Sequence, residues 1–419
     1  MPLKIGYMRL NSDVKLNLMT QQNTGQGIEH RRGFLNALVS QGHKVTIASY
    51  VSKADTPLFS SRSWIGQMIY DQKSELNNFD VIILEAASNN PRFSRIVDRD
   101  TVNIEDVNAI AVENKFVYDS TEDDEKQGLA KYSILQYNLK RIARYKGKVI
   151  LWHQTYGEDS IFPFRQVLKS SNKPVEKLSS LNWRHMLGSD GEDIMGFFKD
   201  KEWTILHHAL NEQVFANTRS SRFGFAYSDI PNVKYKYVHA PISYLDPYYD
   251  VRENPKYDAF YAAGREGQWR TEERTKNVLY WYDVPLYKGV VLGKSWNEVK
   301  LNYAQNFELD GGIPAAMSCW NNSYTSIYTD CTPALNAGIL LGRSFLSLRS
   351  GAVLLIDKRL SGYEKLDMNE FVVQTPEDAK NWIDKIKGMS VSQRDELRKS
   401  QLATYPDWKD ISWESVLCS

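Results

Sequence analysis

The sequence predicts an α/β protein built from two doubly wound, Rossmann-like domains that face a central cleft. The chain has 419 residues, more than one ordinary core holds. Short apolar runs alternate with segments of helical periodicity, as in parallel sheets covered by helices. The stretch PISYLDPYYDVRENPKY (241–257) interrupts that alternation with prolines and turn-forming residues. We therefore place the domain boundary between residues 245 and 246.

The first domain, residues 1–245, opens with a strand–helix–strand unit. In GQGIEHRRGFLNALVSQG (25–42) the apolar residues recur at close to helical spacing, and Gly42 can end the helix. A strand, a crossover helix and a second strand imply a parallel pair. Strands are expected at residues 3–10, 43–50, 79–87, 147–154, 202–209 and 233–242, with further helices at 132–147 and 210–224.

The second domain, residues 246–400, repeats the pattern. Strands are expected at 257–264, 287–293, 323–330, 351–357 and 369–374, and helices at 270–282, 335–348 and 376–388. The tail, residues 401–419, has its tryptophans and aliphatic residues at amphipathic spacing. We expect it to form a helix that packs back on the first domain.

Composition narrows the class of protein. The formal net charge is +1, so no overall basic field indicates nucleic acid, although a local basic face stays open. Three cysteines without metal-site spacing predict a reducing compartment and no disulfide framework. His207 and His208 are adjacent on an expected strand, so they point to opposite faces and do not form a simple metal pair. With no apolar run near 18 residues, we expect a cytoplasmic protein that does not bind membranes. We also expect it to be a monomer.

An arginine-rich turn follows the first strand of the second domain, in YDAFYAAGREGQWRTEER (257–274). Gly264 lets the backbone approach a ligand closely, and a helix start presents free N–H groups. Arg265 and Arg270 add forked donors that match phosphate oxygens. The turn is therefore a candidate diphosphate cradle. The alternative is a solvated turn with ordinary surface arginines.

This turn resembles the phosphate-binding stretch of the T-even bacteriophage DNA β-glucosyltransferase family, Tyr-Gly-Gly-Ser-Phe-Arg-Ser-Gly-Gln-Arg. YAAGREGQWR (261–270) fits it without a gap. Arg270 takes the place of the second phosphate arginine. Arg265 lies one position before the place of the first, which Glu266 occupies.

Two further segments of the second domain resemble the family in the same order. LDGGIPAAMS (309–318) is similar to a turn whose isoleucine contacts uracil through its backbone, and Ile313 matches that residue. LGRSFLSLRSGAVLLID (341–357) is similar to a run that places Arg343 as a donor-binding arginine. Leu346 stands where the family has a ribose-binding glutamate, which leaves Ser344 or Ser347 as substitutes.

The resemblance also reaches the first domain. EDSIFPFRQ (158–166) is similar to the family segment that carries the catalytic base, so Asp159 would be the general base. Glu158 and His153 are the rival bases, and an exposed loop carboxylate or a helix N-cap is the alternative for Asp159.

Three further residues have roles that the resemblance implies. Gly27 and Glu29 would lie at the start of the first helix, with Glu29 on a sugar hydroxyl. A helix-start carboxylate favoured by the dipole is the alternative for Glu29. Asp330 roughly matches an aspartate near the sugar, and a strand-end turn aspartate is its alternative.

The resemblance implies the GT-B fold and an inverting glycosyltransferase. The donor would be a UDP-sugar carrying glucose, or a pentose such as arabinose, with no tightly bound cofactor. The acceptor would be 5-hydroxymethylcytosine in double-stranded phage DNA, in the cytoplasm of an infected bacterium. A divalent metal would at most stimulate the reaction. The alternatives are a cell-envelope glycan or small-molecule acceptor, and a non-enzymatic nucleotide- or DNA-binding protein.

Overall fold

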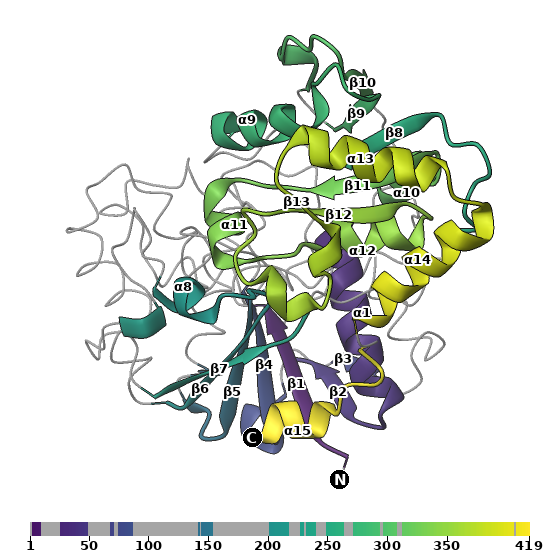
Figure 1. Cartoon of the computed structure of the whole chain (residues 1–419). Coiled ribbons are helices and arrows are strands. Elements are labelled where there is room, and N and C mark those ends of the chain that lie inside the picture. Colours follow the sequence, from purple (N-terminus) through teal and green to yellow (C-terminus); the bar gives the residue numbers. More distant parts are fainter. Residues whose placement is uncertain are drawn as a thin grey trace, which may run out of the picture.

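The computed structural model describes most of the second domain and the central elements of the first. The described residues are 2–9, 26–48, 68–70, 74–86, 141–142, 144–153, 201–217, 227–229, 232–239, 249–263, 271–293, 296–307, 312–405 and 408–419. They form two sheets, one above the other in Figure 1, each with helices packed on it.

The first sheet has seven described strands in the order β3-β2-β1-β4-β5-β6-β7, and every described pairing is parallel. The strands are β1 (Lys4–Arg9), β2 (Lys44–Ile47), β3 (Met68–Tyr70), β4 (Val81–Ala86), β5 (Lys148–His153), β6 (Trp203–His207) and β7 (Val233–Tyr237). In the described part of the first domain, the helices α1 (Gln26–Ser40) and α8 (Glu212–Asn217) accompany them.

Alternation along these strands creates one apolar face that α1 covers. Ile5 and Tyr7 on β1 and Ile83 on β4 are buried on this face, where they pack with Phe34 of α1. Successive strand residues point to opposite faces, so every second residue contributes to this core. The helical spacing of the apolar residues in α1 brings its matching stripe onto the same face.

The second sheet has the order β10-β9-β8-β11-β12-β13, again with parallel pairings throughout the described strands. Its strands are β8 (Tyr257–Ala262), β9 (Gly289–Leu292), β10 (Gln305–Phe307), β11 (Ser323–Tyr328), β12 (Val353–Asp357) and β13 (Val372–Val373). Its helices are α9 (Thr271–Tyr282), α10 (Gly312–Asn321), α11 (Thr332–Ala337), α12 (Gly342–Arg349), α13 (Pro376–Lys387) and α14 (Val391–Ala403). Short 3₁₀ helices lie at 76–78, 227–229, 296–298, 363–366 and 369–371. The doubly wound α/β class predicted from the sequence is confirmed.

The single helix expected at 335–348 is wrong, because two helices occupy this region. Gly338 ends α11 in the left-handed conformation with φ of 67°, which a glycine adopts without strain. The chain then turns at Leu341 and starts α12. The break places the beginning of α12 at the edge of the sheet.

Four elements were not expected from the sequence. The edge strands β3 and β10 are only three residues long, too short for a clear alternation pattern. Helix α10 starts with glycine, isoleucine and proline, which read as a turn although proline is favoured at a helix start. Helix α14 has a capping box between Ser390 and Gln393, a local signal that could have identified it. Since α14 ends at Ala403, it runs through the expected boundary at residue 400.

The tail lies in the core of the first sheet. Trp408 and the helix α15 (Trp413–Cys418) pack with Phe34 and Trp152; the ring centroids of Phe34 and Trp408 are 5.0 Å apart. Lys236 on β7 donates to the Val416 carbonyl at 2.7 Å. A cation at the last carbonyls of α15 complements the helix dipole, so apolar packing and charge both dock the tail.

A second link joins the two sheets directly. Leu210 N donates to the Gly338 carbonyl at 2.9 Å, and Asn211 N donates to the Ala337 carbonyl at 3.1 Å. A Cβ at Gly338 would lie 2.0 Å from the Ser361 carbonyl oxygen, so only glycine fits. The end of β6 is therefore hydrogen-bonded to the end of α11.

Candidate functional site

The second sheet has a topological switch point between β8 and β11. These strands are neighbours at the centre of the sheet, and the chain continues from β8 to β9 on one side and from β11 to β12 on the other. Ligands of open α/β sheets bind outside the carboxyl ends of the strands at such a point. The segment 264–270 follows β8, so the predicted phosphate turn begins at this edge.

Arg343, near the start of α12, lies at this switch point. Its Nη2 donates to the Thr329 carbonyl at 2.9 Å and forms an ion pair with Asp330. Its guanidinium carbon lies 5.2 Å from the ring centroids of both Tyr261, near the end of β8, and Tyr328, the last residue of β11. The break between α11 and α12 makes this placement possible, because it brings the first turn of α12 back to the strand ends.

Asp330 holds a second arginine. Nε of Arg274, on α9, lies 2.8 Å from Oδ1 of Asp330. Burial alone would raise the pKa of Asp330, but Arg343 and Arg274 outweigh it and hold that pKa at about 2. One ionised carboxylate thus joins two guanidinium groups that come from different helices.

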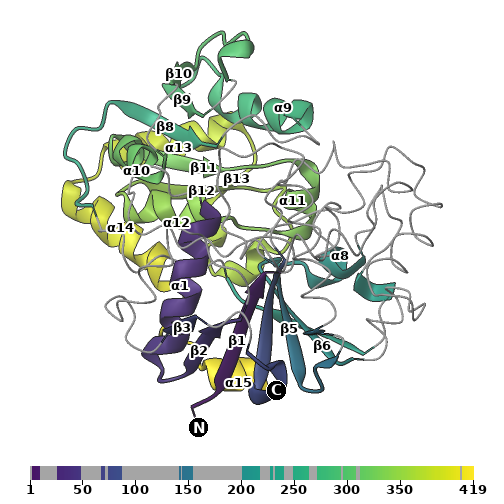
Figure 2. The same cartoon turned by 180° about the vertical axis from the view of Figure 1, so that it is seen from behind.

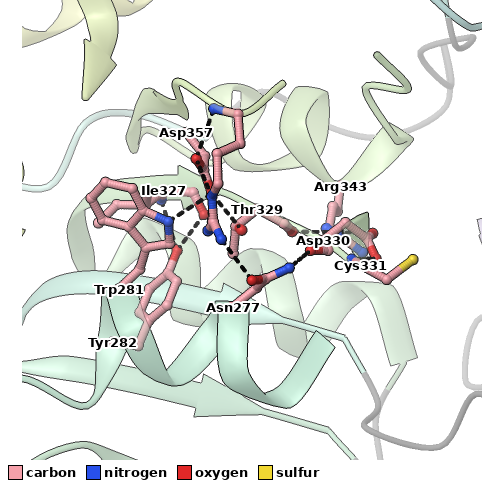
Figure 3. Close-up of polar contacts among 10 residues, drawn as sticks. Asn277, Trp281, Tyr282, Ile327, Thr329, Asp330, Cys331, Arg343 and Asp357 are labelled. Atoms are coloured by element: carbon pink, nitrogen blue, oxygen red, sulfur yellow. Dashed lines mark hydrogen bonds and ion pairs between the residues drawn. The ribbon is translucent and has the colours of Figure 1, made fainter. Parts of the chain in front are cut away.

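A second carboxylate extends the network (Figure 3). Asp357, at the end of β12, accepts from Trp281 Nε1 and from Thr329 Oγ1, both at 2.8 Å. Arg359 binds Asp357 and also donates to Asn277 Oδ1 at 2.7 Å, while Asn277 Nδ2 donates to the Asp330 carbonyl at 2.7 Å. These bonds fix α9 against the ends of β11 and β12.

Three buried polar atoms at this edge have no hydrogen-bond partner among the described residues. They are Arg343 Nε and, beside this arginine, Ser344 Oγ and Tyr261 Oη. Leaving such a group unpaired costs about 1–3 kcal/mol. By contrast, Ser347 Oγ donates to the Ser344 carbonyl at 2.7 Å. Of the two serines considered as substitutes for a ribose ligand, Ser344 is therefore the one with hydrogen-bonding capacity to spare.

The predicted site residues are only partly described. Arg343 lies at the switch point with Asp330. Gly27 and Glu29 lie in the first turns of α1, and Ile313 lies in the first turn of α10. The other four, Asp159, Gly264, Arg265 and Arg270, lie outside the described residues. The structure describes β5, which ends at His153 before Asp159, and it describes β8 and α9, which lie on either side of the other three in the sequence.

Leu346 is buried in an apolar cluster with Phe260 and Met317. It packs against the helix that begins beside Ile313. The sequence did not identify Asn277, Asp357 or Arg359 as members of the network. An aspartate at the end of an apolar strand was the only local signal for Asp357, and that signal is common in turns.

The first sheet has its own switch point, between β1 and β4. There Glu85, on β4, accepts from Arg31 of α1 through both oxygens: Nε to Oε2 at 2.6 Å and Nη2 to Oε1 at 2.5 Å. The Tyr7 hydroxyl, from β1, donates to the same carboxylate. Burial disfavours the charged form of Arg31, but the attraction of Glu85 outweighs it and raises the Arg31 pKa. No local sequence pattern indicated that these three residues would meet.

The adjacent histidines face different partners. His207 Nε2 lies 3.2 Å from Glu212, whereas His208 Nδ1 lies 2.6 Å from the Val238 carbonyl. Within the described part of the chain, no group of three or more His, Cys, Asp or Glu side chains could hold a metal ion. Among the helices that the structure describes, none is both long enough and apolar enough to cross a membrane.

Comparisons with known proteins identify the fold. Neither a protein-family model nor a curated protein matches the chain. A crystal structure of T4 phage BGT in complex with its UDP-glucose substrate is similar, with 12% identity, 99% of both chains covered and a TM-score of 0.57. T4 phage BGT in complex with UDP and Mn²⁺ gives the same values. A third structure, described as the DNA-modifying enzyme β-glucosyltransferase, has 11% identity, the same coverage and a TM-score of 0.55. At the level of the fold, the resemblance inferred from the sequence is confirmed, and the chain has the two-sheet GT-B architecture of these glycosyltransferases.

Proposed function

We propose that this protein is an inverting glycosyltransferase that moves a sugar from a UDP-sugar to 5-hydroxymethylcytosine in phage DNA. The observation that carries the proposal is the position of Arg343. This arginine lies at the switch point of the second sheet, and its buried Nε has no hydrogen-bond partner among the residues that the structure describes. An anionic ligand at this edge would supply the missing acceptor.

The donor side follows from charge and geometry. Arg343 and Arg274 share the single carboxylate of Asp330, so this described network carries more positive than negative charge. The predicted phosphate arginines, Arg265 and Arg270, belong to the segment between β8 and α9, both of which contact this network. Guanidinium groups held in a buried site can stabilise the negative charge that develops on a leaving diphosphate.

The acceptor side rests on Asp159, which comes six residues after the end of β5 in the sequence. As general base, it would take the proton of the acceptor hydroxyl while that oxygen attacks the anomeric carbon. Attack from the side opposite the diphosphate gives a single displacement with inversion. A base inside a DNA duplex would have to leave the stack to reach such a site.

The described fold agrees with this assignment. The similar structures include complexes with UDP-glucose and with UDP and Mn²⁺. For this chain we propose glucose, or a pentose such as arabinose, as the sugar. Because Asp330 is already paired with two arginines, we propose that a divalent cation is not required for the fold and at most stimulates turnover. The proposed working state is a monomer in the cytoplasm of an infected bacterium.

Mass spectrometry of nucleosides tests the proposal. Duplexes with hydroxymethylcytosine or with cytosine would be incubated with UDP-glucose, UDP-arabinose and other UDP-sugars, and then digested. We expect a nucleoside that is heavier by one sugar residue, only from the hydroxymethylated duplex. Arg343→Ala should lose this product, whereas the matched control Arg252→Ala, at an exposed position, should keep it. UDP-sugar turnover that requires a glycan acceptor and ignores DNA would contradict the proposal that DNA is the acceptor. No turnover with any donor would contradict the proposal that the protein is an enzyme.

Salt dependence separates the acceptors further. Duplex binding that depends on phosphate contacts weakens steeply as salt rises, because counterions are released on binding. We expect duplex affinity to fall between about 50 and 200 mM salt. An affinity that does not change over this range would argue against DNA as the acceptor.

A further inference from the structure

We propose that Glu85, Arg31 and Tyr7 are positioning residues that set the start of α1 against α12 and thereby align the two halves of the site. This inference rests on the proposed function. None of the three needs to touch a substrate.

The geometry of this network is specific. Ile83 of β4 pairs in register with Tyr7 of β1, and Glu85 lies two residues beyond Ile83 on the same strand. Tyr7 and Glu85 therefore share the sheet face that α1 covers. The carboxylate receives Arg31 through both oxygens and the Tyr7 hydroxyl as well. The Arg31 and Glu85 side chains are 1% and 0% exposed. The network thus joins β1, β4 and α1 at one buried point.

The physical cost of this pair argues for more than stability. Removing two charges from water costs free energy that their attraction only partly recovers, so apolar residues of similar volume often hold a fold equally well. An apolar contact, however, tolerates rotation and sliding of a helix, whereas a two-pronged guanidinium–carboxylate pair fixes both. The network therefore constrains the rotation of α1 about its axis and its height above the sheet.

The constrained end of α1 is the end that faces the second domain. Helix α1 starts at Gln26 and contacts α12, and both views show this end beside α12 (Figures 1 and 2). Helix α12 carries Arg343 and Ser344. Arg31 lies in the second turn of α1, two residues after the predicted sugar ligand Glu29. A change in the seating of α1 would therefore shift the first half of the site relative to the donor arginine of the second half.

The double variant Arg31→Met/Glu85→Leu tests this inference. It replaces the ion pair with apolar residues of similar size and removes both of its charges from the core together, so we expect the protein to fold with a Tm close to that of the wild type. We expect UDP to bind within about threefold of wild type, since Arg343 and Asp330 are untouched. The kcat of transfer should fall roughly 100-fold, because a small misplacement of reacting groups costs about that much.

Two gentler variants keep the inference testable if the double variant does not fold. Tyr7→Phe removes only the hydroxyl, and Arg31→Lys keeps the charge but loses the two-pronged contact. Both should lower kcat more than they change the UDP dissociation constant, whereas a purely structural role would lower the amount of folded protein and leave the kcat of the folded fraction unchanged.

The outcomes separate the two proposals. Wild-type kcat in the folded double variant, or in both gentler variants, would overturn the positioning network and leave the proposed function intact. No transfer by the wild-type protein with any UDP-sugar would overturn the proposed function, and the network with it.

Discussion

Among the described residues, Glu85 of the first sheet pairs with one guanidinium, that of Arg31, whereas Asp330 of the second sheet pairs with two, those of Arg274 and Arg343. Both carboxylates lie at the switch point of their sheet. The first group is fully buried and matches one negative with one positive charge among the described side chains. In the second, the Arg274 side chain is 17% exposed, and the described charges do not cancel. We therefore propose that the same position holds a helix in the first sheet and presents positive charge to a ligand in the second.

This difference predicts which property a variant of each network will change. Changes on the side of the first sheet should alter kcat or folding and leave UDP affinity nearly unchanged. Changes in the Asp330 network should alter UDP affinity.

The largest effect is expected for Asp159→Asn. The amide keeps the shape of the carboxylate but cannot remove a proton, so kcat should fall by about 10²–10⁴-fold while UDP affinity stays near wild type. Steady-state kinetics and UDP titration measure the two quantities. Glu158→Gln is the matched control, and a loss confined to that variant would move the base from Asp159 to Glu158.

Glu85→Ala should break the first network. It leaves the guanidinium of Arg31 buried without its carboxylate, so the free energy of unfolding should fall by about 3–5 kcal/mol. Denaturant titration measures this change. Glu212→Ala removes a carboxylate that is 50% exposed and should cost less than about 1 kcal/mol. Equal losses of unfolding free energy in the two variants would show that the buried pair stabilises the fold no more than the exposed carboxylate does.

Acid should weaken the second network. The pKa of Asp330 is about 2 in the folded protein, below the value of about 3.9 for an aspartate in an unfolded chain. The folded state therefore favours the ionised form, and this contribution is complete above about pH 5 and is lost as the pH falls toward 2. Asp330→Asn should lower the free energy of unfolding by roughly 2–3 kcal/mol at pH 7, with the difference shrinking below pH 4. A difference that stays constant with pH would contradict the depressed pKa.

Arg343→Ala should weaken UDP binding about 10- to 100-fold, since a charge-assisted hydrogen bond contributes about 1.5–3 kcal/mol. Isothermal titration calorimetry with UDP measures the loss. DNA affinity should not change, which distinguishes a donor ligand from a general surface charge. UDP binding at wild-type strength would remove Arg343 from the site and would weaken the comparison of the two sheets.

The smallest effect is expected for Lys236→Ala, which removes a cation from the C-terminal end of α15. A favourable charge at a helix end contributes about 0.3–1 kcal/mol and is screened by salt. The Tm should therefore fall slightly at low salt and converge with the wild-type Tm at about 1 M salt. A large loss would show that tail docking depends on charge more than on Trp408 and Trp413.

The sequence by itself was sufficient for the fold class and for most of the strands and helices of the two sheets, whereas the role of Arg343 stays a proposal. Strand alternation, helical spacing and glycine or proline turns act over a few residues, so they can be read without knowing the tertiary structure. The boundary between 245 and 246 stays a proposal, because residues 240–248 lie outside the described part of the chain. The short edge strands and the break at Gly338 were missed, because a few residues carry little periodic signal.

Only the tertiary structure decided which charges meet. Arg31 and Glu85 are 54 positions apart, and Arg274 and Asp330 are 56 apart. Each residue by itself reads as an ordinary helix arginine or a strand-end carboxylate. Parallel strands bring their carboxyl ends to one edge, and crossover helices return there, so residues that are distant in the chain become partners. The pairing depends on sheet order and on helix seating, which no local pattern of residues encodes.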